Sequence, residues 1–179
     1  NYKLYLMKIL NSINNFLRYP RAGFTRKHVD DFMHLNFKNV KNANKILDIG
    51  AGYKPYEKYF QNCSYESCDH ADVLSDIGDG NKYQHTFYCD ITKNIPANDN
   101  NYDIVICNEV LEHVNEPSMA LNEIYRVLKS EGKLFITTTQ CHGLHQEPHN
   151  YFNYLSYGLE HLLKKNKFHI IELRPLGGI

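Results

Sequence analysis

Apolar residues are spaced along this chain in two alternating ways. Short apolar runs end in glycine, aspartate or asparagine, which is typical of buried strands in a parallel sheet. Between these runs, apolar residues recur every three or four positions, as on one face of an amphipathic helix. The first pattern predicts strands at 45–49, 64–69, 85–89, 102–107, 133–139 and within 167–176. The second predicts helices at 3–18, 26–40, 53–60, 117–128 and 156–166.

Strands that alternate with helices predict right-handed crossovers, so the expected fold class is α/β, a doubly wound Rossmann-like sheet that is mainly parallel. The first two helices precede the sheet and are expected to form an N-terminal helical cap over residues 1–42, ahead of a main domain at 43–179. In the second helix, the side chains expected to face partly inward are Val29, Phe32, Met33, Leu35 and Phe37. In the helix that begins at Pro117, the expected core face is Met119, Leu121, Ile124, Tyr125, Val127 and Leu128.

Composition indicates a soluble globular protein, since 42% of the 179 residues are hydrophobic and 22% are charged. No apolar run approaches the roughly 20 residues of a membrane span. No secretory signal is visible, and the first residue is Asn1, so we expect a cytoplasmic protein whose native start is missing or processed. The five cysteines form no C-x-x-C pair, which favours reduced thiols. The sequence has no surface pattern that combines basic and aromatic residues, so nucleic-acid binding is not expected.

Charge is unevenly distributed although the formal net charge is zero. Residues 1–45 hold nine Lys or Arg against two acids, and the remainder holds eleven against eighteen. The two regions could simply attract each other or be solvated. Alternatively, the basic N-terminal helices could meet an anionic substrate or make weak contact with a membrane surface.

A glycine turn follows the first predicted strand, in the sequence Asp48-Ile49-Gly50-Ala51-Gly52. Glycine lets the backbone turn sharply and approach a ligand closely. An acid before the turn would repel phosphate, whereas it suits a cationic ligand or one rich in hydroxyl and amino donors. Pro55 stands at the third position of a G-x-G-x-x-G fingerprint, which argues against a dinucleotide, and no phosphate-binding loop of the G-x-x-x-x-G-K-[ST] type exists.

Polar side chains stand at or just past four predicted strand ends, where a doubly wound sheet binds its ligand. Asp69 lies seventeen residues after Gly52, near the spacing at which an acid accepts hydrogen bonds from ribose hydroxyls. Asp90 could accept from an adenine amine, with the neighbouring Ile91 on the adenine face. Asp48 could position an ammonium group. Asn108 follows the fourth strand.

Three segments, in order, resemble motifs of a known family. Residues 46–52 (I-L-D-I-G-A-G) are similar to the first motif of class I S-adenosylmethionine-dependent methyltransferases, and residues 103–114 (D-I-V-I-C-N-E-V-L-E-H-V) to their D-x-V-x-x-x-E-V-L-E-H-V segment. Residues 123–134 (E-I-Y-R-V-L-K-S-E-G-K-L) resemble the E-x-x-R-V-L-K-P-G-G element of the type 11 subgroup, with Ser130 and Glu131 in place of Pro-Gly. The resemblance covers roughly residues 40–175.

This resemblance implies that S-adenosylmethionine is the cofactor and S-adenosylhomocysteine the product. Two glycines and an acid would bound the methionine part of the cofactor, the acid after the second strand would take the ribose, and the next acid with its apolar neighbour would flank adenine. The residues after the fourth strand would lie near the methionine end. Carried over in this order, the positions are Asp48, Gly50 and Gly52, then Asp69, then Asp90 and Ile91, then Asn108 and Glu109. The resemblance assigns no clear chemistry to Glu112-His113, which we expect to hold the helix and loop.

The His-rich loop 140–153 should overhang the transferred methyl group, because it follows the fifth strand. Residues 145–152 (H-Q-E-P-H-N-Y-F) resemble the H-x-x-P-x-D-x-x-R-Y loop of type 11 members found with sugar and cell-surface polysaccharide genes, although Asn150 and Asn153 depart from it. His145 or His149 is therefore the expected catalytic base or acceptor ligand, unless these histidines only hydrogen-bond locally. No metal is expected, because the His142-x-x-His145-x-x-x-His149 spacing lacks a helix and the family pattern accounts for the loop.

The leading hypothesis is methyl transfer to a small-molecule or saccharide-type acceptor, such as a polysaccharide precursor. A non-catalytic cofactor-binding or assembly module is the alternative, and an NAD-type dinucleotide binder is less favoured because of Pro55. The family sheet usually ends with an antiparallel strand, and the chain stops at Ile179 before one is expected. The main domain is therefore expected to be incomplete at its C-terminal end.

Overall fold

The computed structural model describes residues 23–37, 40, 43–71 and 84–176. The described residues belong to two units, one with residues 1–40 and 174–179 and the other with Lys41–Leu173. The helix expected at 3–18 lies outside the described residues. The domain boundary expected between residues 42 and 43 stays a prediction.

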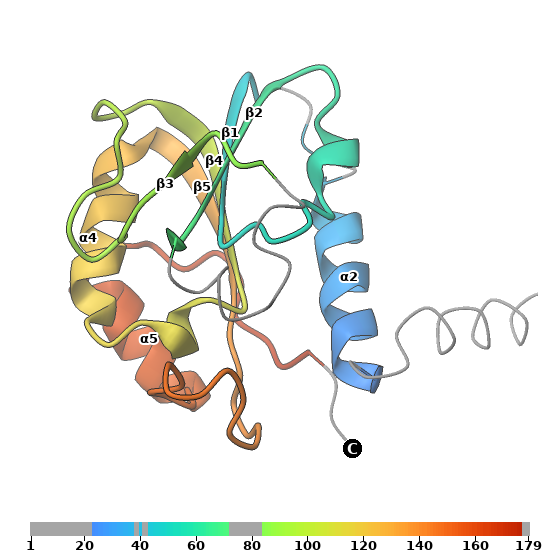
Figure 1. The fold of residues 1–179 in the computed structure, drawn as a ribbon, viewed down its shortest axis with the longest axis vertical. Coiled ribbons are helices and arrows are strands. Elements are labelled where there is room, and N and C mark those ends of the chain that lie inside the picture. The colour runs from blue at the N-terminus through green and yellow to red at the C-terminus, as the bar shows by residue number, and fades with distance from the viewer. Residues whose placement is uncertain (1–22, 38–39, 41–42, 72–83, 177–179) are drawn as a thin grey trace, which may run out of the picture. The chain divides into compact units, whose positions relative to one another are not determined.

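A five-stranded sheet forms the centre of the larger unit, and all of its strand pairs are parallel. The strands follow the order β3-β2-β1-β4-β5, so the chain builds outward on one side of β1 and then returns to build on the other (Figure 1). This reversal between β1 and β4 is the topological switch point, where such sheets bind ligands. The strands are β1 (Lys45–Ile49), β2 (Ser64–Asp69), β3 (Phe87–Tyr88), β4 (Tyr102–Asn108) and β5 (Leu128–Thr137).

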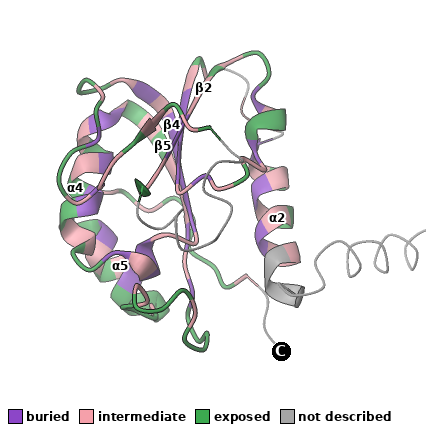
Figure 2. Cartoon of the chain, in the orientation of Figure 1, coloured by how far each residue is buried: buried purple, intermediate pink, exposed green. Residues whose placement is uncertain are grey.

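Two helices, α4 (Pro117–Val127) and α5 (Ser156–Lys165), lie on the same side of this sheet. Pro117 begins α4 because proline needs no hydrogen-bond acceptor for its nitrogen in the first turn. Figure 2 shows buried residues along β4 and on α4 and α5. The core formed here includes Leu47, Val105, Cys107, Ala120, Leu121, Ile124, Leu159 and Leu163. The α/β class and the mainly parallel sheet expected from the sequence are confirmed.

The smaller unit contains α2 (Gly23–Phe37). Its buried side chains are Val29, Met33 and Phe37, which recur every fourth residue, whereas Leu35 is 57% exposed. The expectation of an inward Leu35 is therefore wrong, because its position faces away from the stripe that repeats every four residues. In the described part of the chain, no helix combines the length and the apolar character that crossing a membrane requires.

Three further expectations are corrected by the structure. The segment expected as a helix at 53–60 holds only a 3-10 turn, η1 (Glu57–Tyr59), because Lys54 adopts a positive φ of 54° that an α-helix cannot include. No strand occurs at 167–176, all of which is described. In α4, Met119 and Tyr125 are 50% and 45% exposed, since Ala120, Leu121, Ile124 and Val127 occupy the buried face.

Two strands have boundaries that differ from the expected ones. β3 spans two residues of the expected 85–89, and β5 starts five residues before the expected 133. Leu128 leaves α4 in an extended conformation, so the connection expected before Lys133 is part of the strand.

Asp103 ties three strands together at the start of β4. Its Oδ2 accepts hydrogen bonds from the backbone N–H groups of Asn44 and Lys45, at 3.0 and 2.9 Å, and Lys129 Nζ lies 2.7 Å from Oδ1. Burial raises the pKa of Asp103, but the hydrogen bonds from Lys129 and the two backbone groups outweigh it and hold the pKa below its ordinary value.

We therefore expect Asp103 to make stability depend on pH. A depressed pKa in the folded state contributes stability that is present above the unfolded pKa of about 4 and is lost as pH falls through the folded pKa. Urea unfolding at pH 5, 4 and 3.5 should give a smaller decrease in the free energy of unfolding for Asp103→Asn than for the wild type. Equal decreases in the two proteins would contradict this role.

Candidate functional site

The turn after β1 brings backbone close to the loop that follows β4. Gly50 and Gly52 have positive φ angles of 63° and 50°, and the N–H groups of Gly50 and Ala51 both donate to the Cys68 carbonyl oxygen, at 2.9 and 3.2 Å. A Cβ at position 50 would lie 2.3 Å from Val110 Cγ2. Only glycine allows this approach, because the backbone conformation and the space both exclude a side chain.

Asp69 ends β2 and fastens this turn. Its Oδ2 accepts from the Gly52 N–H at 3.1 Å, and its Oδ1 accepts from the His70 N–H at 2.8 Å. The His85 Nε2 atom lies 3.8 Å from Oδ2, and burial lowers the pKa of His85 despite this carboxylate. Asp69 is thus held in one orientation while one face of it lines a cavity.

Asp90 follows β3 and is held by its own loop. Its Oδ1 accepts from the Thr92 N–H at 2.9 Å and from the Thr92 hydroxyl at 2.6 Å, and Lys93 Nζ lies 3.1 Å from Oδ2. Burial raises the pKa of Asp90, but the bonds from Thr92 and Lys93 outweigh it and keep the carboxylate ionised. Ile91 beside it is 8% exposed and supplies an apolar wall to the same cavity.

Two thiols, Cys68 and Cys89, also line this cavity. A hydrogen bond with Cys68 lowers the pKa of Cys89, whereas the same bond and burial raise the pKa of Cys68. Both cysteines are free.

The end of β4 contributes Asn108 and Glu109. Asn108 is 9% exposed and its Oδ1 accepts a hydrogen bond from the Thr137 hydroxyl. Glu109 has a positive φ of 55°, its N–H donates to the Thr137 carbonyl at 3.1 Å, and its side chain lines the cavity. A glutamate in this backbone conformation is uncommon, and such outliers cluster at functional sites.

The loop after β5 folds back over the 3-10 turn η2 (Leu111–His113). The N–H groups of Tyr151 and Phe152 donate to the Glu112 carbonyl oxygen at 2.9 and 3.2 Å. His113 Nδ1 lies 2.6 Å from the His149 carbonyl oxygen. These bonds place His149 and Tyr151 in the wall of the cavity, with the His149 Nδ1 atom 3.4 Å from the Tyr151 hydroxyl.

The cavity at these strand ends has a volume of about 440 Å³. Its walls include Gly50, Gly52, Asp69, Asp90, Ile91, Glu109 and His149, so seven of the ten positions selected from the sequence come together here. None of the described residues that line it is Lys or Arg, while three are carboxylates. The cavity therefore suits a ligand with cationic groups and hydrogen-bond donors, and it disfavours a pyrophosphate.

Three selected residues lie outside the lining. Asp48 is 2% exposed and accepts a hydrogen bond from the Tyr65 hydroxyl, so its carboxylate already has a partner inside the protein. Asn108 is turned to Thr137. His145 packs against His113, with ring centroids 4.8 Å apart, and against His142. The roles expected for these residues stay predictions.

Sequence reasoning did not select His85, Val110 or Gln146 for this site, although all three lie against Asp69, the glycine turn or the cavity. It gave Glu112 no chemistry, yet Glu112 is fully buried, and burial raises the pKa of its carboxyl. A carboxylate directly after the apolar pair Val110-Leu111 was the one signal available for it.

Comparison with known proteins agrees with the geometry. The model of a family described as "Methyltransferase domain" matches residues 47–136, which is half of the chain. An uncharacterized protein of Methanocaldococcus jannaschii is 32% identical over 111 residues, 62% of this chain and 47% of the relative. The demethylmenaquinone methyltransferase of Paenarthrobacter aurescens is 28% identical over 126 residues, 69% of this chain and 48% of the relative. The chain thus spans about half the length of these curated relatives.

Solved structures share the fold. A SAM-dependent methyltransferase of Archaeoglobus fulgidus superposes with a TM-score of 0.64 at 15% identity, covering 87% of this chain and 74% of the other. One from Aquifex aeolicus gives a TM-score of 0.56 at 18% identity, covering 76% of this chain and 77% of the other.

Proposed function

The chain belongs to the S-adenosylmethionine-dependent methyltransferases of type 11, and we propose that it transfers a methyl group from this cofactor to a small-molecule or saccharide-type acceptor. The observation that carries the proposal is the acidic cavity at the switch point. It combines the glycine turn after β1 with Asp69, Asp90 and Glu109, and no described Lys or Arg lines it.

The residues present fit the cofactor. The backbone of Gly50 lies so close to Val110 that a Cβ would not fit between them. The turn therefore presents backbone, and no side chain, to the cavity at this position. Asp69 would accept hydrogen bonds from the ribose hydroxyls, because its carboxylate is fixed from behind by the Gly52 and His70 N–H groups. Asp90 and Ile91 would flank adenine. Glu109 would face the end that carries the amino group and the cationic sulfur.

The acceptor would enter from the side of the loop after β5. His149 and Tyr151 line the cavity there, and Tyr151, Phe152 and Tyr154 form a row of rings with neighbouring centroids 6.5 and 5.7 Å apart. Aromatic faces of this kind bind the apolar faces of sugars and other rings. One relative is named a demethylmenaquinone methyltransferase, which is consistent with methyl transfer as the reaction.

The chemistry that this cofactor supplies when bound is a methyl group on positively charged sulfur, open to in-line attack. The residues of this chain would align the acceptor and exclude water. His149 is the preferred base, because a Nδ1–H directed at the Tyr151 hydroxyl oxygen leaves Nε2 free to take a proton from an acceptor hydroxyl. His145 is the second candidate.

We expect Asp69→Asn to weaken S-adenosylmethionine binding by about 10- to 100-fold, since a hydrogen bond to a charged group contributes about 1.5–3 kcal/mol. Isothermal titration of the purified chain measures this directly. The matched control is Glu160→Gln, which removes a carboxylate from the surface of α5, outside the cavity. It should bind as the wild type does. Unchanged binding by Asp69→Asn would refute the proposed cofactor site.

A further inference from the structure

A second cluster of polar side chains adjoins the cavity, where η2 meets the loop after β5. One ligand atom each from Glu112, His113 and His145 can be chosen so that all three lie within 4.8 Å of one another. We propose that these three residues bind a divalent transition-metal ion of the Zn²⁺ class. Two imidazoles and one carboxylate form a known donor set for zinc, with the fourth position open to water or substrate.

The Glu112 carboxylate is the strongest reason to expect an ion. Glu112 is fully buried, its Oε2 accepts from the Thr138 hydroxyl at 2.9 Å, and its Oε1 makes no hydrogen bond of good geometry to the described residues, although the backbone N–H groups of Glu112 and Thr139 lie near the carboxylate. A buried carboxylate oxygen without a partner is costly. A cation bound at Oε1 would remove this cost, and Thr138 already holds the carboxylate in place.

The histidines are oriented as metal ligands usually are. His113 Nδ1 lies 2.6 Å from the His149 carbonyl oxygen, and His145 Nδ1 lies 3.0 Å from the Gly143 carbonyl oxygen. A carbonyl oxygen can only accept, so His113 Nδ1 carries the proton and its Nε2 keeps its lone pair. The Gly143 carbonyl is shared with His142, whose Nδ1 lies 2.9 Å from it and 3.1 Å from His145 Nδ1, so the Nε2 of His145 is available to an ion in the tautomer in which His145 Nδ1 is the donor. A backbone carbonyl on the second ring nitrogen is the usual support of a metal-bound histidine.

The distances between the three ligand atoms, which are up to 4.8 Å, need to shorten only slightly for an ion to bind. Ligand atoms around a tetrahedral zinc ion with bonds of about 2.0–2.2 Å lie about 3.3–3.6 Å apart. Glu112 and His113 are held by η2 and its partners, whereas His145 belongs to a loop and is partly exposed. A change in the His145 side chain would bring its nitrogen into range. This donor set differs from the His142-x-x-His145-x-x-x-His149 spacing of the loop, because Glu112 and His113 come from η2.

The ion would have a role in the reaction, because His113 also lines the cavity. An acceptor hydroxyl bound at the open position would have a lowered pKa and a fixed orientation. This role rests on the proposed function. Ion binding itself does not, because it requires only the three side chains.

The test is titration of the chelator-treated chain with Co²⁺, followed by its visible absorption, and with Zn²⁺ by calorimetry. We expect one equivalent to bind, and we expect Glu112→Gln and His145→Ala each to lose at least tenfold in affinity. His161→Ala removes an exposed histidine of α5 and should bind as the wild type does. His145→Ala decides the question if Glu112→Gln fails to fold, because His145 is partly exposed.

The proposal is overturned if the wild type binds no single equivalent, or if His145→Ala binds as tightly as the wild type. S-adenosylmethionine titrations of the same variants separate the two proposals. Loss of metal binding with cofactor binding intact leaves the proposed function standing. Metal binding without cofactor binding would refute the proposed function and leave the metal site in place.

Discussion

Gly50→Ala is expected to destabilise the chain by about 2–5 kcal/mol and to weaken S-adenosylmethionine binding at least about tenfold. Position 50 has a φ of 63°, which costs an L-residue about 1–2 kcal/mol. The new Cβ would also overlap Val110 Cγ2, at 2.3 Å, and overpacking of this kind costs about 1–3 kcal/mol. Both Gly50 and Val110 line the cavity, so the displacement reaches the cofactor site.

Urea unfolding and calorimetric titration measure the two effects. Two variants identify the cause. Gly50→Ala/Val110→Ala removes the overlapping methyl group and leaves the next Val110 atom, Cβ, at 3.6 Å, so it should be less destabilised than the sum of its single variants. Gly143→Ala meets nothing within 4 Å and should stay within about 0.5 kcal/mol of the wild type. Strict additivity in the double variant would show that Val110 is not the obstacle.

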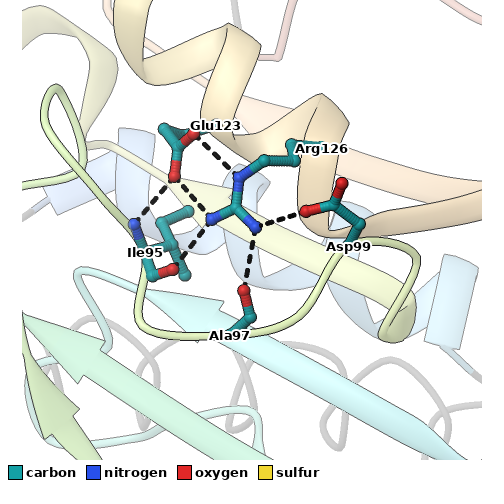
Figure 3. A network of polar contacts seen from close by, with 5 residues as sticks. All are labelled: Ile95, Ala97, Asp99, Glu123 and Arg126. Atoms are coloured by element: carbon teal, nitrogen blue, oxygen red, sulfur yellow. Dashed lines mark hydrogen bonds and ion pairs between the residues drawn. The ribbon is translucent and has the colours of Figure 1, made fainter.

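Arg126→Ala should lower the free energy of unfolding by about 2–4 kcal/mol, a value reduced for partial exposure from the cost of breaking a buried ion pair. Figure 3 shows the guanidinium between Glu123, Asp99 and the backbone of Ile95 and Ala97. Its nitrogens donate to both Glu123 carboxylate oxygens at 2.9 and 2.7 Å, to the carbonyls of Ile95 and Ala97 at 2.9 and 2.8 Å, and to Asp99 at 2.8 Å. Removing it takes a donor away from each of these acceptors, and Glu123 keeps only the Ile95 N–H among its hydrogen bonds to the described residues.

In a chain of this size, that loss corresponds to a decrease in Tm of roughly 4–16 °C. Arg126→Lys should recover only part of it, because an ammonium group lacks the planar fork that reaches two carbonyls and a carboxylate together. Lys93→Ala serves as the control, since the Lys93 side chain is 81% exposed and an exposed ion pair contributes about 0–1 kcal/mol. A Tm for Arg126→Ala within one degree of the control would contradict this account.

The E-x-x-R pattern that helped to identify the family thus has a structural meaning. Glu123 and Arg126 hold the loop between β3 and β4, and Glu123 Oε2 also accepts from the Ile95 N–H at 2.9 Å. Asp103, the aspartate of the D-x-V segment, likewise has a structural role, because it joins β4 to β1 and β5 by hydrogen bonds. Neither role could be read from the sequence, because the partners lie 26 or more positions away along the chain.

The strands with strong patterns could be predicted from the sequence. The segment 64–69 was placed without error, and β4 extended its prediction by one residue. Prediction failed where local pattern and tertiary context differ. Residues 53–60 have helical composition but contain a residue with positive φ, and 167–176 has apolar residues yet pairs with no strand.

The cofactor side of the site was more predictable than the acceptor side. Carboxyl ends of parallel strands meet at one edge, so Asp69 and Asp90 could be expected together from their positions alone. Asp48 occupies the same kind of position, but its side chain is on the face of β1 that meets Tyr65. The Glu112–His113–His145 cluster depends on how a loop folds back onto η2, which no spacing in the sequence encodes.

S-adenosylmethionine is expected to bind in the cavity at the ends of β1, β2 and β4. The most direct measurement is a crystal structure of the chain grown with S-adenosylhomocysteine. We predict density in that cavity, with the ribose hydroxyls within hydrogen-bond distance of the Asp69 carboxylate and adenine against Ile91. Ligand bound elsewhere, or an Asp69 carboxylate that makes no contact with it, would contradict binding at this site.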